Sequence, residues 1–302
     1  MREPHFLIDS GLLLLILSRL PQAFSQAIMR FKYNAADWGR HRGLGAALLA
    51  FVVLQSGCAH TPMDSGRPSA TQVTPFSVAK PGGPFPGGWQ ELRFSKFRAP
   101  TKFEMVDDGG ATVVHATSEN SSSVLLENID IDPRQYSVLR WKWKAPRLVP
   151  GANTTKRQTE DAPVRLIIAF EGDKDKLSFS DQITFAETRL LLGVEPPYAT
   201  LEYEWGDGAP KETVVENGWN ARIRLLLAES GAERVGEWVL ETRNIFDDFR
   251  KAFGEDPGRM ISIGIHCDSD ATESRSEGYF GDIKFLRRDE VDQPANLRKT
   301  GQ

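Results

Sequence analysis

The sequence predicts an all-β fold, an antiparallel jelly-roll β-sandwich with one short helix. Between Trp89 and Arg287, apolar and polar residues alternate with a period of two, which is typical of half-buried strands. Turn-forming stretches such as DDGG, GDG, ENG and EDPG separate these runs at fairly regular intervals. Eight or more short strands spaced in this way favour two stacked sheets around one core.

Each predicted strand places its apolar residues on one face. In SVLRWKWKA, residues 137–145, Leu139, Trp141 and Trp143 share one face, whereas the alternate positions carry Arg and Lys. The same pattern predicts further strands over residues 112–117, 123–129, 164–170, 200–205, 221–228, 237–243, 260–266 and 278–286.

The stretch NIFDDFRKAFG predicts the helix, near residues 244–253. Ile245 and Phe249 belong to an apolar stripe that recurs every four positions. Asn244 is a suitable N-cap, and Gly254 supplies the residue at which such a helix ends.

Composition and charge narrow the classes of partner. The chain has 302 residues, of which 40% are hydrophobic and 26% are charged, as in globular proteins that bury a sizeable core. Its formal net charge of −4 lacks the basic field of a nucleic-acid binder, so we expect no nucleic-acid partner. The two cysteines, Cys58 and Cys267, exclude a disulfide framework and a cysteine-based zinc site.

The first 57 residues are expected to form a signal or anchor region. The apolar run LGAALLAFVVL, residues 44–54, is shorter than the roughly 20 residues that span a bilayer, but it suits the middle of a signal peptide. The LQSGC that follows resembles a bacterial lipoprotein signal, which predicts that Cys58 is acylated and holds the protein on a bilayer. Ordinary cleavage near Ala59 and an uncleaved anchor are the alternatives.

The resemblance to lipoprotein signals also implies a cellular location. Ala59 after the cysteine favours a protein that faces the periplasm from the outer membrane. Because a signal begins near the true N-terminus, we expect translation to start at Met29. The Pro-, Gly- and Ser-rich residues 58–88 predict a flexible tether, residues 89–287 form the jelly-roll domain, and the polar tail 288–302 is expected to be disordered.

Several motifs within the domain resemble one bacterial family. They are WKWK at 141–144, EDxxxR at 160–165, YxW at 203–205, RNIxxDFRxxFG at 243–254, DSDAT at 268–272 and YxGDI at 279–283. The family is an envelope-associated domain of unknown function, number three-zero-four-seven, and the resemblance covers roughly residues 87–287. It implies a galactose-binding-like, carbohydrate-binding jelly roll, and it brings no assigned catalytic residues.

Charged residues opposite the apolar positions are the first candidates for ligand binding. If their strands line one sheet, then its outer face carries the predicted hydrogen-bonding residues Arg140, Lys142, Arg165, Glu202 and Arg224. Such side chains bind sugar hydroxyls in carbohydrate-binding sandwiches. The alternative is a solvated face with cross-strand ion pairs.

Two tryptophans beside turns are candidates for stacking on a sugar ring. Trp205 precedes the turn GDG, and Trp219 follows the turn ENG. An indole ring next to a loop can desolvate the apolar face of a pyranose, although packing against the loop is the alternative.

The stretch HCDSDATES predicts a loop with two nearby carboxylates, Asp268 and Asp270. Closely spaced carboxylates and hydroxyls suit Ca²⁺, which takes 6–8 oxygen ligands, so we expect a structural calcium site there or no cofactor at all. The alternative is a turn in which the aspartates accept hydrogen bonds from nearby backbone N–H groups.

These observations favour a lipid-anchored cell-envelope protein whose β-sandwich binds a polysaccharide or another envelope glycan without catalysis. The second interpretation is a glycan hydrolase or lyase in which Glu202 or Glu204 pairs with Asp268 or Glu241 on the same face. The third is a structural scaffold of the envelope. The sequence contains no GxSxG, HExxH or P-loop motif, which argues against the enzyme.

Overall fold

The computed structural model describes residues 72–93, 99–192 and 195–291. The predicted signal region, the predicted acylation site Cys58 and the first part of the predicted tether lie outside these residues. Among the helices of the described ranges, none is both long enough and apolar enough to cross a membrane.

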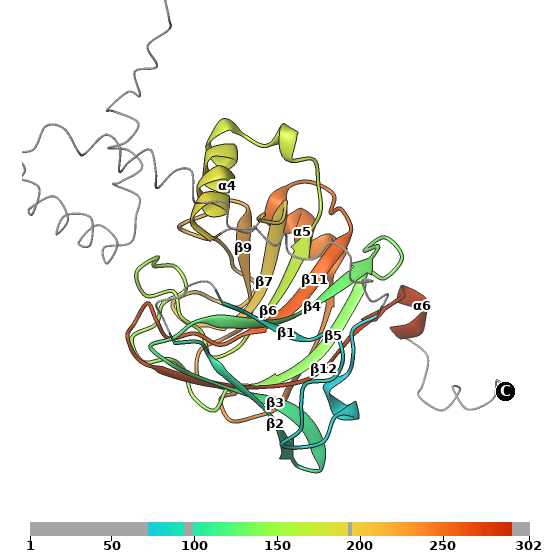
Figure 1. Cartoon of the computed structure of the whole chain (residues 1–302), viewed down its shortest axis with the longest axis vertical. Helices are drawn as coiled ribbons and strands as arrows, with labels where there is room; N and C mark the ends of the chain where they lie inside the picture. The colour runs from blue at the N-terminus through green and yellow to red at the C-terminus, as the bar shows by residue number, and fades with distance from the viewer. Residues whose placement is uncertain (1–71, 94–98, 193–194, 292–302) are drawn as a thin grey trace, which may run out of the picture. The chain divides into compact units, whose positions relative to one another are not determined.

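Two sheets stack face to face and confirm the predicted β-sandwich (Figure 1). The seven-stranded sheet has the order β1 (Gln90–Arg93), β4 (Ser123–Ile131), β11 (Met260–His266), β6 (Arg165–Phe170), β7 (Ala199–Gly206), β9 (Ile223–Ser230), β8 (Val214–Glu216). The five-stranded sheet has the order β10 (Val239–Asn244), β5 (Val138–Lys144), β12 (Arg275–Leu286), β3 (Ala111–Glu119), β2 (Lys102–Asp108). Every predicted strand is present, and β1, β2 and β8 are additional.

The core lies between the sheets and is rich in aromatic rings. Trp141 and Trp143 of β5 face inward, with ring centroids 5.2 Å apart. Across the core Trp141 lies 5.0 Å from the ring of Tyr203 and Trp143 lies 6.4 Å from the ring of Trp205. Burial of each large apolar side chain contributes about 1.5–3 kcal/mol, so these contacts hold the two sheets together.

One strand pair departs from the predicted antiparallel pattern. β7 and β9 run parallel, because the edge strand β8 lies between them in the chain and pairs antiparallel with β9 from its other side.

A helix that the sequence analysis did not predict connects β6 to β7. This helix, α4 (Phe179–Leu192), buries Phe185 but leaves Phe179 and Leu190 exposed. Because so little of α4 is buried, its sequence carries no clear apolar stripe that would predict a helix. The predicted helix is present as α5 (Ile245–Phe253), with the Asn244 side chain accepting from Asp247 N and Gly254 in the left-handed conformation at φ 74°.

Both ends of the predicted domain are longer than expected. The 3₁₀ helix η2 (Phe76–Val78) falls within the predicted tether, yet Phe76 is buried and its ring lies 4.5 Å from that of Trp89. Thr74 donates two hydrogen bonds to the buried Glu127, so residues 72–88 belong to the folded domain. The predicted tail begins with the short helix α6 (Arg288–Val291). A second 3₁₀ helix, η3 (Lys174–Lys176), precedes α4.

Candidate functional site

Strand register places three rows of side chains on the outer face of the seven-stranded sheet. The first row contains His266, Arg165 and Glu204 on β11, β6 and β7. The second row contains Leu126, Gly264, Ile167 and Glu202, and the third contains Asn128, Ser262, Ala169 and Thr200. The residues between these positions in each strand, such as Ile263 and Ile168, face the core.

The second and third rows form the floor of a cavity of about 580 Å³. That volume lies within the range of about 300–1,000 Å³ typical of small-molecule sites. The walls come from β1, from α4 and the segments beside it, and from the loop before β9. Their lining residues are Leu92, Arg93, Lys174, Thr184, Thr188, Glu195, Pro196, Pro197, Asn217, Trp219, Asn220, Arg222 and Ile223.

Small residues keep the middle of this floor open. A Cβ atom at Gly264 would lie 2.7 Å from Cγ1 of Val124, so a larger residue at this position would force the Val124 side chain to move. Ser262 and Ala169 beside it are also small. The floor therefore joins an aliphatic surface to short polar side chains.

The first row forms a buried ionic network at one end of the cavity floor. Arg165 Nε donates to Glu204 Oε2 at 2.6 Å, and Arg165 Nη1 donates to Asp268 Oδ2 at 2.7 Å. Thr154 donates to the second oxygen of Glu204. Burial lowers the pKa of Arg165, but the surrounding carboxylates raise it well above its ordinary value, so Arg165 stays charged.

Glu202 is the acidic residue of the cavity floor. Its side chain is 13% exposed, and its nearest ionic contact is Arg165 Nε at 3.9 Å. Among the described residues, none donates a hydrogen bond to the Glu202 carboxyl group. Burial raises the pKa of Glu202 to about 7, against the attraction of Arg165, which lowers it. The cavity thus contains one acidic group that changes charge near neutral pH.

The loop before β9 holds an aromatic ring at the rim. Asn217 Oδ1 accepts from Trp219 N at 2.9 Å and from Asn220 N at 3.1 Å, which fixes this turn. Trp219 is 50% exposed, and the guanidinium of Arg157 lies over its ring, 3.2 Å from the centroid. Trp219 is therefore held in place, with part of its surface exposed at the cavity.

A family model matches residues 87–284 and includes both sheets and the whole cavity floor. The chain belongs to the family described as Protein of unknown function (DUF3047). The predicted resemblance is thereby confirmed. No curated protein matches the chain.

Three solved structures are similar to the DUF3047 domain at low TM-scores. The Emp47p carbohydrate recognition domain has a TM-score of 0.36 and 10% identity, with 72% of this chain and 95% of that one covered. The K3 cleaved adhesin domain of Lys-gingipain from Porphyromonas gingivalis W83 has a TM-score of 0.31 and 8% identity, with coverages of 70% and 98%. The Spr0440 glycoside hydrolase domain, Endo-D from Streptococcus pneumoniae R6, has a TM-score of 0.27 and 8% identity. The match covers 65% of this chain and only 21% of that chain. Likeness at this level carries no information about function.

The predicted ligand residues do not form one surface. Glu202 and Trp219 line the cavity of the DUF3047 domain, and Arg165 lies beside it, buried among carboxylates. Arg140 and Lys142 belong to β5 in the other sheet, which corrects the expectation that all these residues share a face.

Two further expectations are corrected by burial and pairing. Trp205 is 1% exposed, and its indole N–H donates to the Gly231 carbonyl, so Trp205 packs in the core and offers no face to a sugar. Arg224 pairs with Glu216 at 2.8 Å and is not among the residues that line the cavity.

A third carboxylate, that of Asp161, lies beside the predicted calcium residues Asp268 and Asp270. One carboxylate oxygen from each of Asp161, Asp268 and Asp270 lies within 4.8 Å of the others. The oxygens of Asp161 accept from the backbone N–H groups of Ala271 and Thr272, and from the Thr272 hydroxyl. Those of Asp268 accept from Ala162 N and from Arg165. Because N–H and O–H groups use these oxygens, and Arg165 supplies positive charge, the cluster fits a cation poorly.

The carboxylate pairs suggested for a hydrolase do not converge in the cavity. Of Glu202, Glu204, Asp268 and Glu241, only Glu202 lines the cavity. Glu204 and Asp268 are bound to Arg165, and Glu241 lies on β10 in the other sheet.

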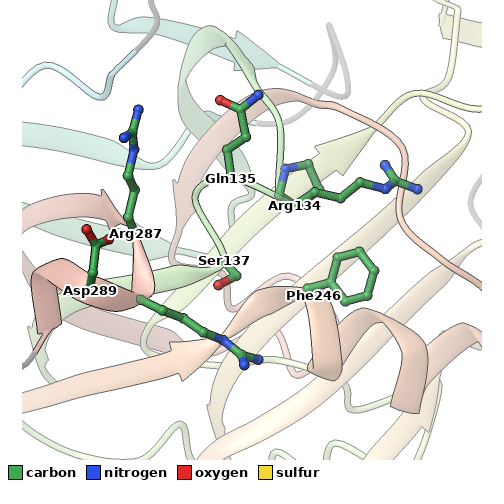
Figure 2. A pocket seen from close by; sticks show the side chains of 8 residues that line it. Arg134, Gln135, Ser137, Phe246, Arg287 and Asp289 are labelled. Atoms are coloured by element: carbon green, nitrogen blue, oxygen red, sulfur yellow. The ribbon is translucent and has the colours of Figure 1, made fainter.

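A second hollow, of about 530 Å³, lies where β5 begins and β12 ends (Figure 2). Arg134 and Arg287 contribute side chains to it, but Figure 2 shows their guanidinium groups pointing away from each other. Arg288, also in the lining, lies 3.6 Å from Asp247. These arginines do not converge on one ligand, so the sheet cavity is the stronger candidate.

Proposed function

We propose that the DUF3047 domain binds a carbohydrate, without catalysis, in the cavity on the outer face of its seven-stranded sheet. The observation that carries this proposal is the arrangement of the floor in two adjacent rows. Leu126 and Ile167 provide an aliphatic surface, and Asn128, Ser262 and Thr200 provide amide and hydroxyl groups beside it.

A sugar ring presents matching chemistry. One face of a pyranose consists of C–H groups that gain from leaving water, while its edge carries hydroxyl groups that must keep hydrogen bonds. The aliphatic row suits the C–H face, and the polar row suits the hydroxyl edge. Glu202 and Asn217 add an acceptor and an amide at the β7–β9 end, and Trp219 adds an aromatic surface at the rim.

The proposal is tested by a glycan array followed by calorimetric titration of the full-length protein with the glycans that bind. Ser262→Trp fills the cavity floor, whereas Thr242→Trp places the same ring at an exposed position on the other sheet. We expect saturable binding that Ser262→Trp weakens at least about tenfold, equivalent to about 1.4 kcal/mol, and that Thr242→Trp leaves unchanged. An array without any saturable ligand, or equal binding by both variants, would contradict the proposal.

We also propose that the protein is lipid-anchored in the cell envelope, through Cys58, and faces the periplasm from the outer membrane. The support is the LQSGC sequence behind a short apolar run. Intact-mass analysis of the natural product should show a chain that begins at an acylated Cys58. Cys58→Ser should release the protein from the membrane fraction, and a mature chain that retains residues 1–28 would contradict the proposed start at Met29.

A further inference from the structure

The acidic end of the cavity contains more negative than positive groups. Four carboxylates surround the single guanidinium of Arg165: Glu204 at 2.6 Å, Asp268 at 2.7 Å, Glu202 at 3.9 Å and Glu160 at 4.0 Å. Arg165 donates its hydrogen bonds to the first two of these, and it also donates to the backbone carbonyl of Glu160. Glu202, which lines the cavity, receives none of them.

Neighbouring bases do not balance this excess. Burial and the nearby Arg165 lower the pKa of His266 well below its ordinary value, so His266 contributes no charge at neutral pH. On the rim, Lys174 lies 2.9 Å from Glu195, and Arg222 lies 2.6 Å from Glu255.

The third rim base, Arg93, is 59% exposed and lies 3.3 Å from Glu91. Each described base of the lining therefore has its own carboxylate. Glu160 accepts from Asn217 Nδ2 at 3.0 Å, so Glu202 is the acidic group whose oxygens remain available to a ligand.

We propose that the saccharide bound in this cavity carries a protonated amine, as a glucosamine unit without its acetyl group does, and that the ammonium pairs with Glu202. This inference rests on the carbohydrate-binding function proposed above. An ammonium group offers three hydrogen-bond donors and one positive charge. Glu202 has only the guanidinium of Arg165 nearby, at 3.9 Å, and that guanidinium donates its hydrogen bonds to other groups. An N-acetylated sugar would offer one amide N–H and no charge.

Ion pairing should couple binding to proton release. Since burial raises the pKa of Glu202 to about 7, part of the free protein holds a proton there at neutral pH. A bound ammonium favours the ionised carboxylate, so a sugar amine that is already protonated in solution should release this proton from Glu202 as it binds.

The test compares a β-1,4-linked glucosamine tetramer with its fully N-acetylated counterpart, by calorimetry on the full-length protein at neutral pH. Two buffers of different ionisation enthalpy report the protons released. We expect the amine tetramer to bind at least about tenfold more tightly and to release protons, the tenfold ratio being about 1.4 kcal/mol. Glu202→Gln should reduce the preference for the amine tetramer to less than about twofold, while its affinity for the N-acetylated tetramer stays unchanged. Glu104→Gln on β2 is the matched control.

The outcomes separate this inference from the proposed function. Equal or tighter binding of the N-acetylated tetramer, or a preference that survives Glu202→Gln, overturns the amine assignment and leaves carbohydrate binding in place. Saturable binding of calcium alone that depends on Glu202 also overturns it, in favour of a metal. If neither tetramer nor any array glycan binds, the proposed function fails, and this inference fails with it.

Discussion

Arg165 and Glu204 are directly paired neighbours on β6 and β7, with Arg165 Nε donating to Glu204 Oε2 at 2.6 Å. The Arg165 side chain is 3% exposed and that of Glu204 is 0% exposed, so solvent screens this ion pair very little. Asp268 receives a second hydrogen bond from the same guanidinium. The pair therefore fixes the end of the cavity beside Glu202.

Replacement of Arg165 by Met should destabilise the fold strongly. Removing one partner of a buried ion pair leaves uncompensated charge and costs about 3–5 kcal/mol. We expect urea unfolding of Arg165→Met to show a loss of that size. Arg140→Met removes a cation that is hydrogen-bonded only to Thr242 among the described residues, and it should cost less than about 1 kcal/mol. Equal losses in the two variants would contradict a structural role for the Arg165 network.

Glu202 should make stability depend on pH. The pKa of Glu202 is raised from its ordinary value of 4.5 to about 7 in the folded protein. The protonated carboxyl group therefore contributes fully to the free energy of unfolding below pH 4.5, and this contribution is lost as the pH rises through about 7. One pKa unit corresponds to about 1.4 kcal/mol, so the loss amounts to about 3 kcal/mol.

Glu202→Gln removes this titration while other groups still titrate. The free energy of unfolding of the variant relative to the native chain should therefore rise by about 3 kcal/mol across that interval. Urea unfolding of both proteins over this pH range measures the difference. Parallel stability curves would show that the Glu202 carboxyl has an ordinary pKa.

Trp219 should contribute to binding more than to stability. Trp219→Ala removes an aromatic surface from the cavity rim, and we expect it to weaken the glycan found on the array by about tenfold. Because the side chain is 50% exposed, the free energy of unfolding should change by less than about 1 kcal/mol. Trp238→Ala is the control, because its ring lies beside Lys142 and Lys144 of β5, in the other sheet. If the two variants bind equally well, the ring of Trp219 does not contact the sugar.

Calcium should not stabilise the protein. Asp161 and Asp268 already accept hydrogen bonds at their carboxylate oxygens, so we expect neither millimolar calcium nor a chelator to move the thermal midpoint. Asp161→Ala, by contrast, should lower the midpoint, because it removes the acceptor for two backbone N–H groups. A rise with calcium that Asp161→Ala abolishes would restore the metal site predicted from the sequence.

Local alternation was sufficient to predict the strands, because a half-buried strand leaves its period in the sequence. It could not assign strands to sheets. β5 and β6 are consecutive strands in the chain, but they belong to different layers, so Lys142 of β5 and Arg165 of β6 do not share a face.

The cavity floor could not be predicted from the sequence, because the small residues in its middle carry neither the charge nor the large apolar surface that marks a candidate binding residue. Ser262 and Gly264 alternate with Ile263 and Ile265 in MISIGIH, and this pattern already indicated a shallow outward surface on β11. Trp205 shows the opposite error. Trp205 follows Tyr203 at a spacing of two in β7, so both rings face the core. The alternation along the strand was therefore a better guide to the position of Trp205 than the turn that follows it.

The central claim, that the outer face of the seven-stranded sheet binds a saccharide, is tested most directly by a crystal structure of the protein grown with a bound glucosamine oligomer. We predict electron density for a sugar ring over Ile167 and Ala169, with a ligand nitrogen or hydroxyl within hydrogen-bonding distance of Glu202. Density over Arg140 and Lys142 on the other sheet, or in the hollow beside Arg287, would contradict the claim.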